Sequence, residues 1–291
     1  MKNHITLFLF LTLPMFVFSQ GIMNLGGTDT GEGDKETLDL ATIRVYYYFT
    51  QKSKSDSKPF RSDTMTLDIG ATHSYYYDET KIQKDSLYNS VMNNLNVTRI
   101  NSITVLKDND RAFENYLGDI TTNSFFDGTT EKIYKNRSNN ELTITDFSSN
   151  PYRCEDKLGA LEWKITEDTA TVLNYQCQKA TISFRGRNYE AWFAPEIPIN
   201  DRPWKFLGLP GLILRVTDDA NLISFEGIGL QFLQTPYPIK IAKLKYMNCN
   251  RKELAKVIRR RGGSISIGNQ GGNLTVVQKS LDNNFEFLEN D

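Results

Sequence analysis

The chain of 291 residues carries 34 Lys and Arg side chains against 35 Asp and Glu, which gives a formal net charge of −1 at pH 7. So even a balance gives no reason to expect nucleic acid or an anionic membrane surface as a partner. The length suffices for one large domain or two small ones, and we expect one.

A secretory signal peptide is predicted at the N-terminus. Lys2 precedes an apolar run from Ile5 to Phe18, and the small residue Ser19 follows, an order that is typical of signal peptides. A membrane anchor, the alternative, needs about 20 apolar residues, and this run is shorter and interrupted by Pro14. We expect residues 1–19 to be removed, the remainder to be exported, and no transmembrane segment to remain.

The residues after the signal peptide change in character near residue 40. Residues 20–40 are rich in glycine and acidic side chains and show no periodicity, so we expect a flexible segment outside the core. Residues 41–291 are expected to form a single β-rich domain.

Alternating side chains predict β-strands over much of residues 41–291. The stretch "TIRVYYYFT", residues 42–50, has a period of two residues. It places one set of side chains on one face and a second set on the other: Ile43, Val45, Tyr47 and Phe49 against Arg44, Tyr46 and Tyr48. Further strands are predicted in "MTLDIG", "SITVL", "EKIYKN", "ELTITDF" and residues 274–277, and a hairpin in "TISFRGRNYEAWF". The sequence therefore predicts a mainly β fold, a curved antiparallel sheet or half-barrel with two short helices.

The two helices are predicted from their N-terminal caps. Asp85 is expected to cap a short amphipathic helix that carries Leu87, Val91 and Leu95. Asn250 and Glu253 have the spacing of a capping box, and the helix that follows them would end in a basic run before Gly262. We expect that basic run to be a solvated helix end.

Three cysteines allow at most one internal disulfide. Disulfides form in the oxidising compartments that exported proteins reach. Cys154 and Cys177 flank a predicted strand around "LEWKI", so we expect these two to be bonded and Cys249 to be free. Three separate thiols are the alternative.

The sequence indicates no metal, cofactor or nucleophile site, and we predict none. His73 is the one histidine that remains after signal removal, and we expect it to be a strand or turn residue; no Cys or His pair has zinc-ligand spacing. A serine-hydrolase elbow needs G-x-S-x-G, but Ser266 stands where "GGSIS" would need its last glycine. Glu190 and Glu196, on either side of Trp192, leave a catalytic carboxylate pair open.

The stretch "GLPGLIL", Gly208 to Leu214, predicts a tight turn that leads into a buried strand. Pro210 and Gly211 suit the two central positions of a type II turn, in which Gly211 has a positive φ. Gly208 would permit a close backbone approach, and Leu209 would be extended before proline. The apolar residues after Gly211 are typical of a strand covered on both faces. A binding role for the turn is the alternative.

Several motifs between Trp163 and Phe225 carry a family resemblance: Cys177-x-Lys179-Ala180, Arg185-Gly186-Arg187, Trp192, Glu196-Ile197-Pro198 and "GLPGLIL". With these motifs the chain resembles the GLPGLI family, secreted bacterial proteins named after the last of them; the agreement over residues 42–162 is looser. The chain departs from the family at Asp201-Arg202-Pro203, where a glycine is expected before the proline. The resemblance implies a cell-envelope protein of a Gram-negative bacterium, in the periplasm or at the outer surface, with no assigned reaction.

Three classes of function remain. The first is a non-catalytic envelope protein that binds an apolar or peptide ligand, or a partner such as an outer-membrane transporter, on a curved sheet. The second is a hydrolase of envelope glycans or peptides, which needs two carboxylates about 5 to 9 Å apart in a cleft. The third is a structural or adhesive protein. We favour the first and expect no enzyme activity. Tyr46, Tyr48 and Trp192 are the candidate binding surface, with Tyr75, Tyr77 and Tyr189 as further aromatic strand residues.

Overall fold

The structure, a computed structural model, describes most of the chain from residue 34 onward. The described residues are 34–54, 58–59, 61–94, 102–107, 128–147, 150–157, 159, 161–206, 208–260, 265–270 and 273–278. The predicted signal peptide and residues 20–33 lie outside these ranges. The helices are α1 (Glu79–Asn94) and α3 (Arg251–Arg260). The strands are β1 (Lys35–Gln51), β2 (Arg61–Ile69), β3 (His73–Asp78), β4 (Ser102–Lys107), β5 (Lys132–Asn136), β6 (Glu141–Phe147), β7 (Pro151–Lys157), β8 (Lys164–Val172), β9 (Tyr175–Phe184), β10 (Arg187–Ala194), β11 (Leu212–Asp218), β12 (Ile223–Ala242), β13 (Met247–Cys249), β14 (Ile265–Gln270) and β15 (Asn273–Gln278).

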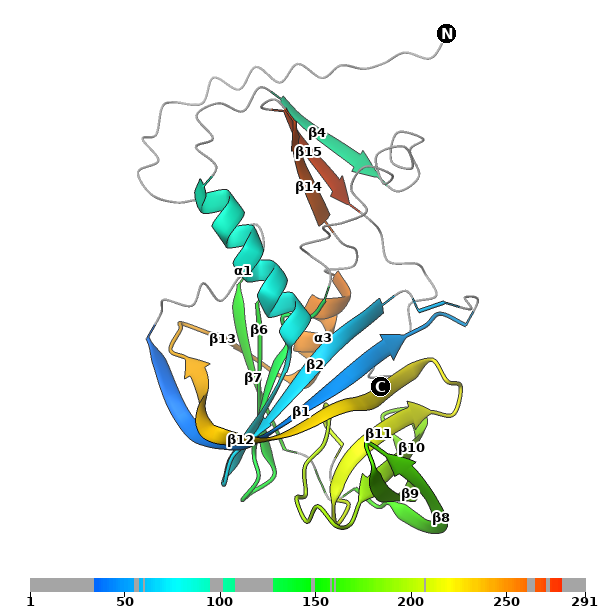
Figure 1. Ribbon diagram of the computed structural model, residues 1–291. Coiled ribbons are helices and arrows are strands. Elements are labelled where there is room, and N and C mark those ends of the chain that lie inside the picture. Colours follow the sequence, from blue (N-terminus) through cyan, green and yellow to red (C-terminus); the bar gives the residue numbers. More distant parts are fainter. Residues whose placement is uncertain are drawn as a thin grey trace.

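Twelve of the strands form one open, curved sheet in the order β13-β7-β6-β5-β3-β2-β1-β12-β11-β10-β9-β8 (Figure 1). The neighbours with a described register are antiparallel, except for the short pair of β13 and β7. The predicted hairpin is formed by β9 and β10, which Arg185 and Gly186 join. Strands β14, β15 and β4 form a separate sheet. The prediction of a mainly β fold with a curved antiparallel sheet is therefore confirmed, and the sheet does not close into a barrel.

One face of the large sheet, the core face, carries the main hydrophobic core. Val45, Tyr47 and Phe49 of β1 are buried there, as the alternation predicts, while Tyr48 is 44% exposed. The segment between β10 and β11 closes this core with Phe206, whose ring packs edge-on or tilted against aromatic rings of β9, β10 and β12. Full burial of each large apolar side chain stabilises the fold by about 1.5 to 3 kcal/mol.

The GLPGLI segment enters a buried strand, but its two glycines have the opposite roles to those predicted. Gly208 has a φ of +100°, whereas Gly211 is not among the residues with positive φ, so the predicted type II turn at Pro210 and Gly211 is wrong. A Cβ on Gly211 would lie 2.3 Å from the carbonyl oxygen of Ala194. Gly211 is therefore required by the close approach of two backbones. The next three residues, 212–214, are all buried at the start of β11.

The long strands β1 and β12 bend together over the face opposite the core. We call residues 35–41 of β1 and 237–242 of β12 the β1–β12 arm. The register between these strands shifts at three places, and such bulges bend a strand pair. The arm buries a second, smaller hydrophobic cluster on that opposite face: Ala41, Tyr134, Ile239 and Ile241. The prediction that residues 20–40 are flexible is wrong for residues 35–40, because they pair with β12.

The helices differ in how well their starts are predicted. Helix α1 begins before Asp85: the cap is Asp78, whose Oδ1 accepts a hydrogen bond of 2.9 Å from the backbone N of Lys81. Asp85 lies inside the helix and pairs with Lys81. For α3 the predicted capping box is present, since the backbone N of Glu253 donates to Asn250 Oδ1 at 3.0 Å and the reciprocal bond measures 2.9 Å. Neither helix, within the described residues, is long and apolar enough to cross a bilayer.

All three cysteines are free thiols, so the predicted Cys154–Cys177 bond is not formed. Cys154 lies on β7 and Cys177 on β9, near opposite ends of the strand order. Cys154 instead stands directly opposite Cys249 in the parallel β7–β13 pair. Burial raises the pKa of the Cys154 thiol to about 12, and the nearby Cys249 adds to the effect.

Candidate functional site

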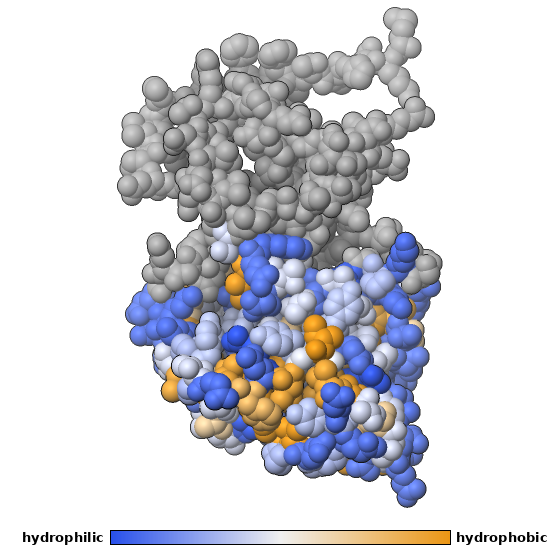
Figure 2. Space-filling view, viewed as in Figure 1, coloured by the Kyte–Doolittle hydropathy of each residue, from blue (hydrophilic) through white to orange (hydrophobic). Residues whose placement is uncertain are grey.

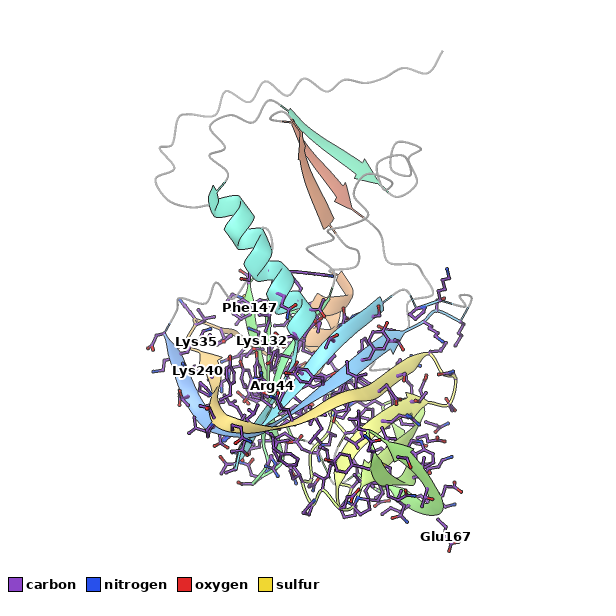
Figure 3. All side chains as sticks on the ribbon, in the orientation of Figure 1. Lys35, Arg44, Lys132, Phe147, Glu167 and Lys240 are labelled. Carbon is purple, nitrogen blue, oxygen red and sulfur yellow. The ribbon has the colours of Figure 1, made fainter. Side chains whose placement is uncertain are left out.

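A cavity of about 610 Å³ opens on the sheet face opposite the main core. It lies where the start of α1, strands β3 and β5 and the β1–β12 arm meet, and Figure 3 shows Lys35, Lys132, Phe147 and Lys240 in this region. We call this cavity the tyrosine pocket and the sheet face that bears it the pocket face. The pocket is lined by Lys35, Tyr75, Tyr77, Asp78, Glu79, Lys81, Ile82, Asp85, Ser86, Thr129, Thr130, Lys132, Phe147, Tyr237, Pro238 and Lys240.

Three stacked tyrosines form an aromatic wall at the pocket, and two of them, Tyr75 and Tyr77, line the cavity. The ring centroid of Tyr75 lies 4.3 Å from that of Tyr77 and 4.7 Å from that of Tyr134, with interplanar angles of 18° and 13°. Tyr75 and Tyr77 are two residues apart on β3, and Tyr134 lies opposite Tyr75 on β5, so the strand period places all three on one face. The hydroxyl of Tyr134 donates to the backbone oxygen of Lys240 at 3.1 Å, which ties the row to the arm.

An ion pair on the same sheet face contacts two pocket tyrosines, Tyr77 of the wall and Tyr237 of the arm. Asp68 accepts two hydrogen bonds from the Arg44 guanidinium, at 2.5 and 2.9 Å, and a third from the Tyr77 hydroxyl at 3.3 Å. The same guanidinium lies 4.7 Å from the ring centroid of Tyr237, on the arm. Hydrogen bonding to Asp68 raises the pKa of Arg44, and burial raises the pKa of Tyr77, so both groups keep their protons.

Lysines from three strands line one side of the tyrosine pocket. Lys35 comes from β1, Lys132 from β5 and Lys240 from β12. The Nζ of Lys132 lies 6.0 Å from the ring centroid of Phe147, within cation–π range. The α1 side of the pocket is more acidic and includes Glu79. The strand side therefore suits an anionic group of a ligand whose flat or apolar part rests on the tyrosines.

Two buried carboxylates lie together where α1 meets the sheet. Arg61 hydrogen-bonds to Asp63, and its Nη2 lies 3.9 Å from Asp78. Burial raises the pKa of Asp78 to about 6; the charge of Asp63 adds to the effect, and Arg61 opposes it. Asp78 also accepts backbone hydrogen bonds of 2.9 Å from Lys81 and Thr129. The cap of α1, on the pocket wall, therefore changes charge at mildly acidic pH.

The predicted surface residues Tyr46, Tyr48 and Trp192 lie on the pocket face but do not line the pocket. Residues directly opposite each other on adjacent strands point to the same face of a sheet. Tyr46 lies opposite Thr66, which lies opposite Tyr77, so Tyr46 and Tyr77 share a face. In the same way, Trp192 shares a face with Tyr48 through Arg215 and Glu226. Tyr189 points the other way and belongs to the main core. In the space-filling view of Figure 2, hydrophobic residues gather in the lower part of the described surface, among hydrophilic ones.

The two carboxylates considered for hydrolysis, Glu190 and Glu196, have separate surroundings. Glu190 pairs with Lys179 at 2.5 Å and accepts a hydrogen bond of 3.1 Å from the Trp192 indole. Glu196 follows β10 and accepts a hydrogen bond of 3.2 Å from the backbone N of Gln176. A second cavity, of about 570 Å³, is lined by Glu190 but not by Glu196.

His73 is a structural residue at the start of β3. Its backbone N donates to Asp39 at 2.8 Å, and Thr72 donates its backbone N to the same carboxylate at 2.6 Å. Burial acts to raise the pKa of Asp39, but these backbone hydrogen bonds outweigh it and lower the pKa. The contact ties the β1–β12 arm to the β2–β3 turn. Among the described residues, no group of three or more His, Cys, Asp or Glu side chains is placed to hold a metal ion.

The sequence identifies Tyr75 and Tyr77 as aromatic strand residues but does not reveal the pocket. The side of the pocket with Tyr237, Lys35 and Lys240 forms because residues 35–41 pair with residues 237–242. Most of the chain separates these two segments in sequence. The alternation of Ile239, Lys240 and Ile241 is a strand signal. The prolines at 236 and 238 argue against a strand at this place, because proline removes a ladder donor.

Comparisons with known proteins match one family model and several solved structures. A family model described as "Protein of unknown function (Porph_ging)" matches residues 184–215, from the end of β9 through the GLPGLI segment. No curated protein matches the chain. Two solved structures of PNGF-II, in P21 and C2 space groups, are similar over 79% of this chain, with 15% and 16% identity and a TM-score of 0.47 each. The matched part is 35% of those chains, so this chain spans about a third of their length.

Proposed function

We propose that the chain is an exported, non-catalytic cell-envelope protein of the GLPGLI type that binds a small ligand in the tyrosine pocket. The ligand has a flat or apolar part that rests on Tyr75, Tyr77 and Tyr237, and an anionic group that reaches Lys132 and Lys240. An acidic amphiphile or a peptide carboxyl group has this chemistry. Export rests on the apolar run that follows Lys2.

The observation that carries the proposal is the meeting of a stacked tyrosine wall and a lysine side in one cavity. Its volume of about 610 Å³ lies within the usual range for small-molecule sites. The wall is built in advance, because Asp68 and the arm hold its rings in place without a ligand. A preformed wall favours binding, since little side-chain entropy is lost when the ligand arrives.

A non-catalytic role fits the contents of this pocket. Its three carboxylates already have partners: Asp78 caps α1, Asp85 pairs with Lys81, and Glu79 accepts a hydrogen bond of 3.3 Å from Gln83. The carboxylates considered for hydrolysis, Glu190 and Glu196, belong to the other half of the sheet. Binding with release is therefore the function that these residues support best.

Two fluorescent probes test the binding site. Anilinonaphthalene sulfonate has a flat ring system and one anionic group, and phenylnaphthylamine has nearly the same rings without the charge. Tyr237→Ala should weaken both probes about three- to tenfold, because stacking on an aromatic ring is worth about 0.5 to 1.5 kcal/mol. The double variant Lys132→Gln/Lys240→Gln should weaken the sulfonate at least about threefold and leave the neutral probe unchanged.

Lys164→Gln is the matched control, because Lys164 lines the second cavity instead. It should leave the affinity for both probes as in the native protein. Equal affinities of the native protein and of all the variants for the sulfonate would refute the tyrosine pocket as the site. If Lys164→Gln alone abolished the binding of both probes, the binding site would be the second cavity.

A further inference from the structure

A buried charge cluster lies on the core face, where β5 meets the segment that joins β10 to β11. Lys135, Asp201 and Arg202 are each at most 2% exposed. The Nζ of Lys135 lies 2.9 Å from Asp201 Oδ1 and also donates to the backbone oxygen of Arg202. Arg137 approaches from the β5–β6 turn, with its Nε 3.6 Å from Asp201 Oδ2. The cluster belongs to the hydrophobic interior and not to the tyrosine pocket.

The cluster has more positive than negative charge. Lys135, Arg137 and Arg202 carry three positive charges and Asp201 carries one negative charge, an excess of two. Within the described part of the chain, Asp201 is the one carboxylate in ion-pair contact with these cations. Burial of unpaired charge is costly. Burial accordingly lowers the pKa of Lys135 to about 8 and that of Arg202 to about 10, although Asp201 opposes both changes.

The two guanidinium groups also hold unused hydrogen-bond donors. The Nε atoms of Arg137 and Arg202 are buried and make no hydrogen bond among the described residues; Arg137 Nε lies 3.6 Å from Asp201 Oδ2, which is also buried without a hydrogen bond. Their other nitrogens are engaged: Arg202 Nη1 donates to Asn200 Oδ1 at 2.6 Å, and Arg137 Nη1 donates to the backbone oxygen of Gly70 at 2.6 Å. These bonds fix the orientation of both groups, so the free donors keep a defined direction.

A small cavity adjoins these cationic residues. Its volume is about 60 Å³, and it is lined by Lys135, Asn136, Arg137, Asn140, Leu142, Asn200 and Arg202. A water molecule needs about 10 to 15 Å³ of such space, so the cavity has room for a small ion with its contacts. Asn140 and Asn200 are exposed, which gives the cavity a route to solvent.

We propose that this cavity binds a small inorganic anion, chloride or an oxyanion of similar charge, between Lys135, Arg137 and Arg202. An anion would accept hydrogen bonds from the unused Nε donors and would offset part of the excess charge. Water could accept the same bonds but would leave the charge in place, and a cation would increase the excess. This site is separate from the tyrosine pocket and does not depend on the function proposed for it.

Thermal unfolding of the purified chain tests the site. The melting temperature is measured at constant ionic strength while sodium chloride, and in a second series sodium sulfate, replaces sodium gluconate. Gluconate is too large for a cavity of about 60 Å³. A ligand that binds only the folded state raises the melting temperature with its concentration. We expect a rise of about 3 to 5 °C at ten times the dissociation constant.

Variants separate this binding from general salt effects. Arg202→Gln and Arg137→Gln each remove a guanidinium and should reduce the rise by at least half. Lys157→Gln changes an exposed lysine and should keep it. Arg137→Gln is included because the Arg137 side chain is 23% exposed and its replacement disturbs the interior less. A crystal soaked in bromide gives a direct readout that needs no variant.

We expect an anomalous bromide peak within hydrogen-bond distance of Arg202 Nε. If the melting temperature rises more with sulfate than with chloride, and both arginine variants lose this difference, the site is assigned to an oxyanion. The proposal is overturned if chloride, sulfate and gluconate give the same melting temperature. It is also overturned if both arginine variants keep the full rise, or if the soaked crystal shows water alone in the cavity.

Discussion

The two halves of the large sheet use their faces in different ways. Around β9, β10 and β11 the core face is closed by the chain segment that ends in the GLPGLI stretch, and the important feature is a close approach of backbones. Around β1, β3, β5 and β12 the opposite face is covered by the bent arm, and the important feature is a set of side chains around a cavity. The tyrosine pocket therefore lies outside the half with the recognisable motif, and the second cavity lies within that half.

The two halves differ because they require different residue types at their important positions. Gly211 lies against the carbonyl oxygen of Ala194, and only glycine fits at this position because a Cβ would clash with that oxygen. The pocket demands only an aromatic wall and a cationic side, which residues such as Tyr77 and Lys240 supply from distant parts of the chain. Substitutions should therefore affect folding in the first half and binding in the second.

The largest effect is expected at the GLPGLI segment. Gly211→Ala would place a Cβ 2.3 Å from the oxygen of Ala194, so one of the two backbones must move. We expect a loss of about 4 kcal/mol in the free energy of unfolding, at the upper end for a single substitution. Urea unfolding measures the loss, and the protein that stays folded should bind anilinonaphthalene sulfonate with unchanged affinity.

Two glycines serve as controls for this prediction. Gly208→Ala strains a residue with a φ of +100° and should cost about 1 to 2 kcal/mol. Gly159→Ala has nothing within 4 Å of the new Cβ and should change stability little. A fully stable Gly211→Ala protein that no longer bound the probe would reverse the comparison, because the motif would then act in binding.

A cross-link within the pocket half is the second prediction. A bond between Cys154 and Cys177 would have joined the two halves, but the register places Cys249 opposite Cys154 on the neighbouring strand. The spacing of adjacent strands suits a disulfide. With glutathione disulfide as oxidant, the two thiols give up two protons and two electrons, one sulfur–sulfur bond forms, and two glutathione thiols are released. We expect Cys154–Cys249 as the product.

Non-reducing peptide mapping identifies the product, and Cys177 should remain alkylatable. The bond closes a long loop and should raise the free energy of unfolding by about 2 to 4 kcal/mol. Cys177→Ser should leave the bond intact, whereas Cys249→Ser should prevent it. A mapped Cys154–Cys177 peptide would contradict the structure at this point and restore the prediction from sequence.

The third prediction concerns pH and the cap of α1 on the pocket wall. Because folding raises the pKa of Asp78 from 3.8 to about 6, the folded protein binds more protons than the unfolded chain between these values. The free energy of unfolding should therefore fall as the pH rises from 4 to about 6.5, by roughly 1 to 3 kcal/mol. Measurements stop at pH 4, because Asp39, whose pKa is lowered, would lose its hydrogen-bonded charge below that.

Asp78→Asn tests this assignment, since asparagine also caps helices and so preserves α1. The variant should lose most of the decline in stability between pH 4 and 6.5, and Glu155→Gln, at an exposed site, should keep it. An unchanged decline in Asp78→Asn would assign the proton to another group.

Local patterns predict the strands well because each needs only its own residues. The alternation in residues 42–50 gives both faces of β1, and the capping box at Asn250 gives the start of α3. The roles of Gly208 and Gly211 are not predictable in this way, since they depend on Leu161 and Ala194, which approach from elsewhere in the chain. The Cys154–Cys249 pairing likewise depends on the parallel β7–β13 register.

The candidate site is less predictable than the fold. Tyr75 and Tyr77 are evident from sequence as strand aromatics, but their stacking with Tyr134 requires the β3–β5 register. The lysine side requires the arm to bend, and its bulges leave no clear mark in the sequence. Arg202 is visible in the sequence as a residue before proline, yet its burial beside Lys135 follows only from the fold.

The smallest effect is expected for the surface first predicted from sequence. Trp192 is partly buried, its indole donates to Glu190, and Lys179 lies 5.7 Å from its ring. Tyr48 is 44% exposed. Tyr48→Ala should change the free energy of unfolding by less than about 1 kcal/mol, as surface substitutions usually do. Trp192→Ala should cost more, about 1 to 2 kcal/mol, because Trp192 packs against the core cluster. Neither residue lines the tyrosine pocket, so both variants should bind the two probes as the native protein does. Titrations that show weaker binding in either variant would extend the site along the pocket face into the half with the recognisable motif.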